Sequence, residues 1–205
     1  ILVMKKKIVI LGSTGSIGKT LISILKKEKK NIIIELLTAN KNYRELLKQV
    51  KFFNVKNIII SDKKIYIKIK KKLSSQSVNV FHSFDSLKTI LINKKIDYTM
   101  SSISGMDGLR PTLQIINFTK KIAIANKEAI ICGWSLIQKA WKKNNTQFIP
   151  IDSEHFSIWS LINTAKNKDI EKIFLTASGG PFANYNLDQF KSIKKKEALK
   201  HPNWK

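Results

Sequence analysis

The sequence predicts an α/β protein built on a doubly wound, mostly parallel sheet, and two features indicate this fold. Over the first 150 residues, short β-branched apolar runs alternate with longer amphipathic segments, as in consecutive β-α-β units. A glycine-rich turn stands between the first apolar run and the first amphipathic segment. Because crossovers between parallel strands are right-handed, helices then cover both faces of one twisted sheet.

Each β-branched apolar run is interpreted as a strand, and each longer amphipathic segment as a helix. A helix at 16–27 follows the first glycines. The helix at 42–52 begins with an asparagine suited to cap it and has apolar residues, Leu46 and Val50 among them, at helical spacing. The helix at 127–143 is the longest. Strands are expected at 7–11, 32–38, 57–60, 79–81, 98–101, 121–125 and 147–151.

The type of motif changes after residue 150, and we expect a domain boundary there. The residues Asp-Ser-Glu-His at 152–155 are expected to end one strand, and Ser-Gly-Gly-Pro at 178–181 to end the next apolar run. The prediction is a first domain at 1–150, followed at 151–205 by the incomplete beginning of a second α/β domain.

The net charge of +24 would by itself suggest nucleic acid or an anionic membrane as a partner. However, only Arg44 and Arg110 are arginines, although phosphate and base recognition favours the arginine fork. The lysines are spread along the whole chain rather than gathered in one block. We therefore interpret them as solvated faces and expect no nucleic-acid partner.

Cysteine content and hydropathy indicate in which cellular compartment the protein resides. Cys132 is the only cysteine, which argues against a disulfide framework or a thiolate metal cluster and favours a reducing cytoplasm. Lysines interrupt the isoleucine-rich stretches, so no run reaches the roughly 18 to 20 apolar residues of a membrane-spanning helix. The first residues lack the order of a secretory signal, and Met4 is interpreted as the natural start. We expect a soluble protein without a membrane partner.

The turn Gly12-Ser13-Thr14-Gly15-Ser16-Ile17-Gly18 has the context of a Rossmann-type dinucleotide site, since it joins a strand to a helix. Gly12 permits a tight turn, Gly15 lets the backbone approach a pyrophosphate, and Gly18 allows close helix packing. The helix N-terminus offers unpaired N–H groups to an anion. The hydroxyls of Ser13, Thr14 and Ser16 are expected to add donors. The alternative is a glycine turn before an ordinary capped helix.

The residues after the second predicted strand favour NADPH over NADH. An NAD site usually has an acidic residue there, about 20 residues after the glycines, to bind the ribose 2′-hydroxyl. The sequence instead has Asn40, Lys41 and Asn42. An ammonium group flanked by amides suits a 2′-phosphate.

Asp152 and Glu154 are candidate metal ligands. At the end of an extended strand, residues two apart project to the same side, so both carboxylates could hold one hard cation, Mg²⁺ or Mn²⁺. The alternative is structural, with Asp152 as a helix N-cap and Glu154 in a first helical turn.

Several further polar residues have both a functional and a structural interpretation. Lys127 lies between a predicted strand and a predicted helix. It could bind an oxyanion or a phosphate, or it could be a solvated surface lysine. Ser178, followed by two glycines, offers a hydroxyl and N–H groups to a phosphate, or forms a plain turn. His82 and His155, taken singly, are more typical of hydrogen-bonded structural histidines.

Five strings in this order resemble the 1-deoxy-D-xylulose 5-phosphate reductoisomerase family. They are ILGSTGSIG (10–18), ANKE (125–128), PIDSEH (150–155), SGGPF (178–182) and HPNW (201–204). The resemblance covers essentially the whole chain but corresponds to about the first half of the family's length. It implies that 1–150 is an NADPH-binding domain and that 151–205 begins the catalytic domain.

The resemblance also implies a role for each matching residue. NADPH would be held by the turn from Gly12 to Gly18, by Lys41 and Asn42, and by Asn126 and Glu128, near the nicotinamide and substrate. Catalytic roles fall on Lys127, Asp152, Glu154 and His155, with Asp152 and Glu154 binding the metal. A phosphorylated sugar would contact Lys127, Ser153, Glu154, Ser178, His201 and Trp204, the last on a mobile flap.

The implied activity is a metal-assisted rearrangement of 1-deoxy-D-xylulose 5-phosphate followed by reduction with NADPH, giving 2-C-methyl-D-erythritol 4-phosphate for isoprenoid precursors. Family members usually form homodimers. Asn40 departs from the glycine frequent in the family, and the family's third metal carboxylate lies beyond Lys205. We therefore expect the 205 residues alone to be inactive.

Two other functions compete with this one. A different Rossmann-type dehydrogenase, of the semialdehyde or homoserine kind, would share the glycine turn but would not need the strings at 152–155 and 178–180. A basic nucleic-acid-binding module would be driven by charge, and its binding would weaken steeply with salt.

Overall fold

The computed structural model describes residues 4–164, 169–175, 180–182 and 184–200. The chain divides into two compact units, Ile1–Asp152 and Ser153–Lys205. The predicted sites at Ser178, His201 and Trp204 lie outside the described residues.

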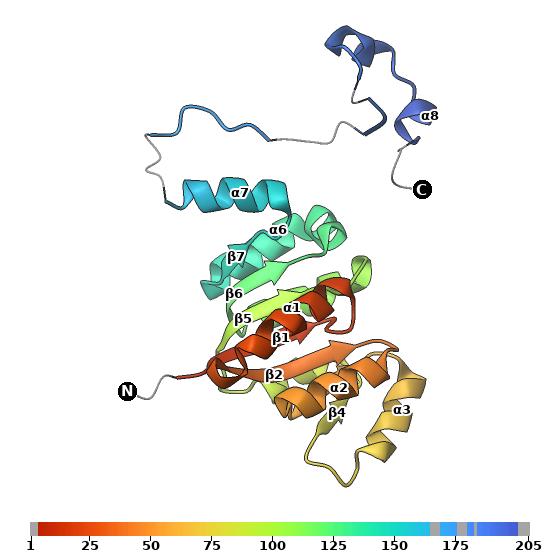
Figure 1. Cartoon of the computed structure of the whole chain (residues 1–205), viewed down its shortest axis with the longest axis vertical. Helices are drawn as coiled ribbons and strands as arrows, with labels where there is room; N and C mark the ends of the chain where they lie inside the picture. Colours follow the sequence, from red (N-terminus) through yellow and green to blue (C-terminus); the bar gives the residue numbers. More distant parts are fainter. Residues whose placement is uncertain (1–3, 165–168, 176–179, 183, 201–205) are drawn as a thin grey trace. The chain divides into compact units, whose positions relative to one another are not determined.

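The first unit is organised around one sheet of seven strands (Figure 1). Its spatial order is β4-β3-β2-β1-β5-β6-β7, and each neighbouring pair is parallel. This confirms the predicted doubly wound α/β fold, and it is the strand order of a Rossmann-type domain extended by one strand. The strands are β1 (Lys6–Leu11), β2 (Ile32–Ala39), β3 (Asn57–Ile60), β4 (Asn79–Phe81), β5 (Ile96–Ser101), β6 (Thr119–Ile124) and β7 (Gln147–Ile149).

The helices of this unit begin and end at residues with clear capping chemistry. The side chains of Asn42, Asp62 and Asn126 each accept a hydrogen bond from a backbone N–H in the first turn of the helix that follows. Asn54 and Asn145 end two of these helices in the left-handed conformation. The helices are α1 (Ser16–Lys27), α2 (Tyr43–Phe53), α3 (Lys63–Lys72), α4 (Leu87–Ile90), α5 (Leu109–Ile116) and α6 (Lys127–Asn144).

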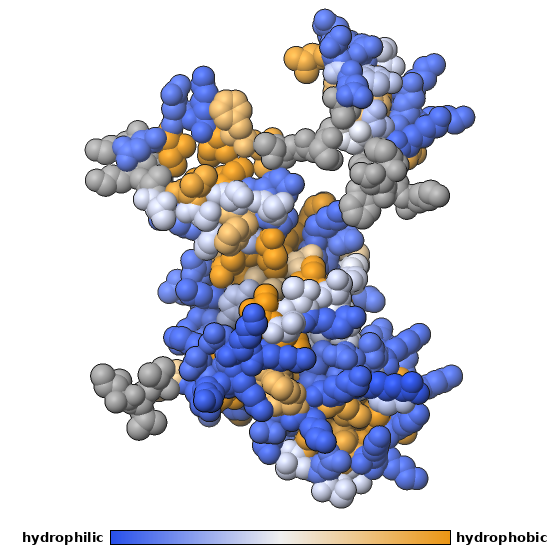
Figure 2. Space-filling view, viewed as in Figure 1, coloured by the Kyte–Doolittle hydropathy of each residue, from blue (hydrophilic) through white to orange (hydrophobic). Residues whose placement is uncertain are grey.

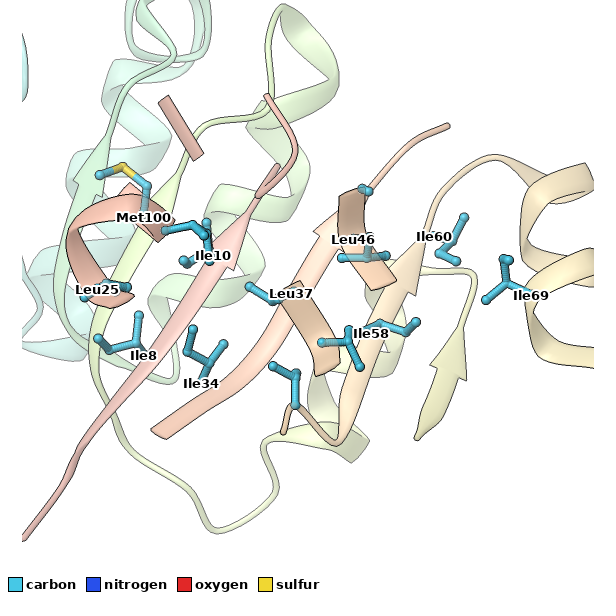
Figure 3. Packing of buried hydrophobic residues seen from close by; sticks show 14 of the residues in the cluster. Ile8, Ile10, Leu25, Ile34, Leu37, Leu46, Ile58, Ile60, Ile69 and Met100 are labelled. Carbon is cyan, nitrogen blue, oxygen red and sulfur yellow. The ribbon is translucent and has the colours of Figure 1, made fainter. Parts of the chain in front are cut away.

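Alternation along the strands divides the core into two layers. In β1, Ile8 and Ile10 pack in the cluster that contains buried residues of α1, α2 and α3, whereas Val9 and Leu11 pack in the cluster of α4, α5 and α6. Figure 3 shows the first cluster, in which Ile10 and Leu37 of the sheet face side chains of the covering helices. The two clusters place helices on both faces of the sheet. In Figure 2 the face carrying α1 to α3 is mostly hydrophilic, which agrees with solvated lysines.

The topology defines where a ligand meets the sheet. The chain winds outward from β1 to β4 and then returns to the other side of β1 with β5, so the order reverses between β1 and β5. Such a reversal opens a crevice at the carboxyl ends of the two strands, where open α/β sheets bind ligands. The backbone N–H of Ser102, after β5, donates to the Leu11 carbonyl at 2.9 Å, which holds the two ends together.

The second unit is helical in the part that the structure describes. It contains α7 (Ser153–Ile162), α8 (Lys195–Ala198) and two 3₁₀ segments, η5 (Gly180–Phe182) and η6 (Leu187–Ser192). Residues 170–175, an apolar run in the sequence, have no regular secondary structure. None of the helices in the described ranges combines the length and apolar composition that a bilayer crossing requires.

The extended geometry predicted for Asp152 and Glu154 is wrong. The strand expected at 147–151 ends at Ile149, and α7 begins at Ser153. Asp152 therefore directly precedes a helix, and Glu154 lies in its first turn. A carboxylate there is favoured by the helix dipole, which is the structural alternative for Glu154. The two carboxylates do not project from one face of a strand.

Candidate cofactor site

The three glycines of the turn after β1 differ in their surroundings. Gly12 has a φ of +80°, and a Cβ there would lie 2.8 Å from the Ser102 carbonyl oxygen. A Cβ on Gly18 would overlap the backbone of Gly12 and Ser13. Among the described residues, a Cβ on Gly15 would meet nothing nearer than 3.5 Å. The fold therefore requires Gly12 and Gly18, whereas packing within the chain does not account for Gly15.

The end of β2 holds the glycine turn in place. The Gly12 N–H donates to the Thr38 hydroxyl at 2.8 Å, and the Ser13 N–H donates to the Thr38 carbonyl at 2.9 Å. Ser13 is fully buried, and its hydroxyl also faces the Thr38 carbonyl, at 3.3 Å. Because this hydroxyl is buried and directed at a backbone carbonyl, its role toward a pyrophosphate stays a prediction that the geometry does not favour. Thr14 is partly exposed and Ser16 is exposed.

The N-terminus of α1 remains available to an anion. Gly15 is its N-cap residue and offers no side-chain cap, and the first turn contains no acidic residue. Amides at a helix start that lack intrahelical acceptors favour negative charge. Exposed Gly15, Ser16 and Ile17 surround this point. The arrangement is that of a phosphate-binding helix start.

Gln49, which the sequence did not single out, connects the turn to α2. It is 3% exposed, and its Nε2 donates to the Ser13 carbonyl at 3.1 Å and to the Glu45 carboxylate at 3.0 Å. The Glu45 N–H in turn donates to the Asn42 side chain at 3.3 Å. A polar residue between Leu46 and Val50 on the apolar face of α2 was the available signal. The network joins the glycine turn to the segment after β2.

The segment predicted to select the cofactor lies at the same edge of the sheet. Asn40 and Lys41 are exposed immediately after β2, at 40–41. Asn42 is exposed too, although its side-chain oxygen caps α2. No acidic residue occupies 38–42. The structure thus brings the glycine turn and Lys41 to neighbouring strand ends, β1 and β2.

Asn126 organises the loops on the other side of the crevice. It is 3% exposed, its side-chain nitrogen donates to the carbonyls of Ile103 and Gly105, and its oxygen accepts the Ala129 N–H at 2.9 Å. These bonds tie the loop after β5 to the start of α6. Lys127 and Glu128, which follow, are exposed in the first turn of α6 at the carboxyl edge.

The next group of predicted site residues, 152–155, follows β7 in the chain. Because the sheet is parallel, the end of β7 lies at the same edge as the glycine turn. Asp152, Ser153, Glu154 and His155 are all exposed. Oxygen donors fit a hard cation such as Mg²⁺. Among the described residues, however, no three acidic, histidine or cysteine side chains form a metal-binding group, so this part of the chain supplies two carboxylates.

His82 has a structural environment. Its Nδ1 lies 3.0 Å from the Ile60 carbonyl, and its ring stacks on Tyr66 with 5.2 Å between centroids.

A cavity of about 500 Å³ lies elsewhere, between the ends of α2 and α3, and is lined by Asn54, Lys56 and Gln76 among others. These residues precede or flank the amino ends of β3 and β4, so the cavity is at the edge opposite the glycine turn.

Two family models and several proteins of known name match this chain in sequence. A family model described as 1-deoxy-D-xylulose 5-phosphate reductoisomerase matches residues 8–133, and one described as the C-terminal domain of that enzyme matches 148–205. A protein of that name from Pelagibacter ubique (strain HTCC1062) is 60% identical over 200 residues, which are 97% of this chain and 52% of that protein. Another from Wolbachia pipientis wMel is 42% identical and is covered to 50%.

Solved structures show the same likeness. The Zymomonas mobilis reductoisomerase in complex with NADPH matches with a TM-score of 0.77 at 30% identity, over 97% of this chain and 52% of that one. A reductoisomerase structure with NADPH, fosmidomycin and magnesium matches with a TM-score of 0.74 at 31% identity, with the same coverage. The chain spans about half the length of the curated relatives it matches.

Proposed function

Because the chain belongs to the 1-deoxy-D-xylulose 5-phosphate reductoisomerase family, we propose that it is the NADPH-binding half of such an enzyme. The reaction would convert 1-deoxy-D-xylulose 5-phosphate to 2-C-methyl-D-erythritol 4-phosphate. It would serve isoprenoid precursor synthesis by the non-mevalonate route. Structures of relatives in complex with NADPH, and with NADPH and magnesium together, support both cofactors.

The observation that carries the proposal is the space left at Gly15. Gly12 and Gly18 are explained by contacts inside the fold. Gly15 is exposed at the N-terminus of α1, and no neighbour in the described part of the chain excludes a side chain there. Without a side chain at Gly15, a pyrophosphate can come close to the backbone at the start of α1. This position lies beside the reversal of strand order, where such sheets bind dinucleotides. The exposed ammonium of Lys41 then suits the 2′-phosphate of NADPH.

Residues near the reacting end divide between positioning and direct contact. The Asn126 side chain makes hydrogen bonds to the loop after β5 and to the start of α6. It would act by placing Lys127 and Glu128 beside the nicotinamide and the substrate. Lys127 would donate to a substrate oxygen or phosphate. Hydride would come from the bound nicotinamide, and the protein's part is to hold the carbonyl carbon against it.

A divalent metal fits the carboxylates of Asp152 and Glu154. When bound, Mg²⁺ or Mn²⁺ would supply charge stabilisation at the substrate's ketone and hydroxyl oxygens. Ser153 would contact a substrate hydroxyl and His155 would support the site. Ser178 and His201 would hold the substrate phosphate, and Trp204 would close over the sugar. These roles are carried over from the family's motifs, and homodimer formation from the habit of the family. A cytoplasmic location is proposed because Cys132 is the only cysteine, which favours a reducing compartment.

The proposal is tested by titrating the 205-residue chain with NADPH and following nicotinamide fluorescence. Saturable binding to one site is expected, with no NADPH oxidation at 340 nm on adding 1-deoxy-D-xylulose 5-phosphate and Mg²⁺. Sub-micromolar binding of nucleic acid in physiological salt, without NADPH binding, would instead favour the basic nucleic-acid module.

A further inference from the structure

A group of cationic side chains surrounds Tyr43, just after the end of β2. Tyr43 is the first residue of α2, and its N–H donates to the Lys41 carbonyl at 2.8 Å. Lys68, from α3, places its Nζ 3.4 Å from the Tyr43 hydroxyl and 5.2 Å from the centre of the ring. Arg44 follows Tyr43 in the first turn of α2. The chain thus gathers positive charge from α2 and α3 beside Lys41.

Arg44 and Lys68 both lower the pKa of the Tyr43 hydroxyl. The Arg44 guanidinium beside it, followed by the Lys68 ammonium, lowers the pKa of the Tyr43 hydroxyl from its ordinary value. A hydroxyl oxygen that accepts from cations restricts where those cations point. The Tyr43 hydroxyl therefore anchors the Lys68 ammonium at the start of α2, where Arg44 is the next residue along the chain.

Neither Arg44 nor Lys68 forms an ion pair with a carboxylate in the described part of the chain. Elsewhere in that part, carboxylates pair with Lys94, Arg110, Lys120 and Lys172. Arg110 thus has a carboxylate partner at 2.8 Å, whereas Arg44 has none among the described residues. Like charges held together without an anion repel one another, and an anionic ligand would relieve that repulsion.

We propose that Arg44, in the first turn of α2, and Lys68, anchored by Tyr43, are specificity-determining residues that bind the 2′-phosphate of NADPH together with Lys41. The inference rests on the proposed function and deepens it. In Rossmann-type domains the ribose 2′-position lies at the end of the second strand, and a nearby arginine accommodates the 2′-phosphate. A guanidinium binds phosphate through two parallel N–H bonds, whereas an ammonium acts as a point charge. Arg44 is therefore the main determinant.

The test compares Arg44→Gln and Lys68→Gln with Lys70→Gln. Lys70 is a matched control, because it is also exposed on α3 and contacts a tyrosine, with its Nζ 3.0 Å from the Tyr66 hydroxyl. Dissociation constants for NADPH and NADH are measured on the 205-residue chain by nucleotide fluorescence, and circular dichroism checks each variant's fold. Tyr43→Phe is a fourth variant, which keeps the ring and removes the anchor.

Arg44→Gln is expected to weaken NADPH binding by about tenfold and Lys68→Gln by about threefold. Tyr43→Phe should weaken it by about twofold, since it removes only the anchor. Affinity for NADH, which lacks the phosphate, should stay within about twofold of the unsubstituted chain in every variant. Lys70→Gln should leave both affinities unchanged.

Two outcomes would overturn the inference in distinguishable ways. NADPH binding that is equally tight in the unsubstituted chain and in Arg44→Gln, or an equal loss for NADH, removes the role of Arg44 while leaving the proposed function in place. Absence of NADPH binding by the unsubstituted chain overturns the proposed function and this inference with it.

Discussion

Replacing Gly15 by alanine separates a functional glycine from a structural one. The backbone at Gly15 has φ −75° and ψ 176°, which alanine adopts without strain. Its Cβ would lie 3.5 Å from the Gly12 carbonyl oxygen and 4.0 Å from that of Ser102, which are ordinary contacts. We expect the free energy of unfolding to change by less than about 1 kcal/mol, and reduced freedom of the unfolded chain can even raise it.

NADPH binding should respond very differently. The new methyl group would stand where the pyrophosphate approaches the start of α1, so we expect affinity to fall at least about tenfold, or about 1.4 kcal/mol. Gly18→Ala is the matched comparison. Its Cβ would overlap the Gly12 carbonyl oxygen, so helix and turn must separate at a cost of about 3 kcal/mol.

The two variants are compared by urea unfolding, followed by circular dichroism, and by NADPH titration. A stable Gly15→Ala that binds NADPH within about twofold of the unsubstituted chain would refute the reasoning, because the space at Gly15 would then have no functional meaning.

Three further predictions follow from other parts of the first unit and the acidic pair. Asn126→Ala should lower the free energy of unfolding by about 1–3 kcal/mol in urea titrations, since it removes a helix cap and leaves the part-buried carbonyls of Ile103 and Gly105 without their donor. For Asp97, burial raises the pKa, but the Lys120 ammonium and the Lys7 N–H outweigh it and hold the pKa below its ordinary value. The ionised carboxylate therefore stabilises the fold above about pH 4, and Asp97→Asn should cost stability at pH 7 with a difference that shrinks as acid protonates Asp97. Asp152→Asn and Glu154→Gln should each weaken Mn²⁺ binding, measured by electron paramagnetic resonance of the free ion, at least about threefold while leaving NADPH affinity unchanged.

The sheet could be predicted from the sequence because its signals are local. A strand buried between two helix layers appears as a short β-branched run, and the expected range 57–60 matches the fully buried β3. The expected range 79–81 matches the edge strand β4. The helix expected at 16–27 matches α1, and Asn42 caps α2 as expected. Buried strands and capped helix starts are both determined by neighbouring residues.

The sequence is a poor guide where local signals conflict or partners are distant. At 150–154 an apolar strand end and a helix start overlap, and Ser153 with Glu154 favours the helix once the strand ends at Ile149. The commitment of the Ser13 hydroxyl to Thr38 joins residues 25 apart, and the Gln49 bond to Ser13 joins residues 36 apart. No local pattern predicts such contacts, because they depend on how the strands are ordered.

The location of the cofactor is the central claim, and amide chemical-shift mapping tests it most directly. With the ¹⁵N-labelled 205-residue chain, adding NADPH should shift the amide signals of residues 12–18, 40–44 and 126–128, which lie at the carboxyl edge of the sheet. Shifts confined to residues 54–56 and 76–78, which line the cavity at the opposite edge, would contradict the account.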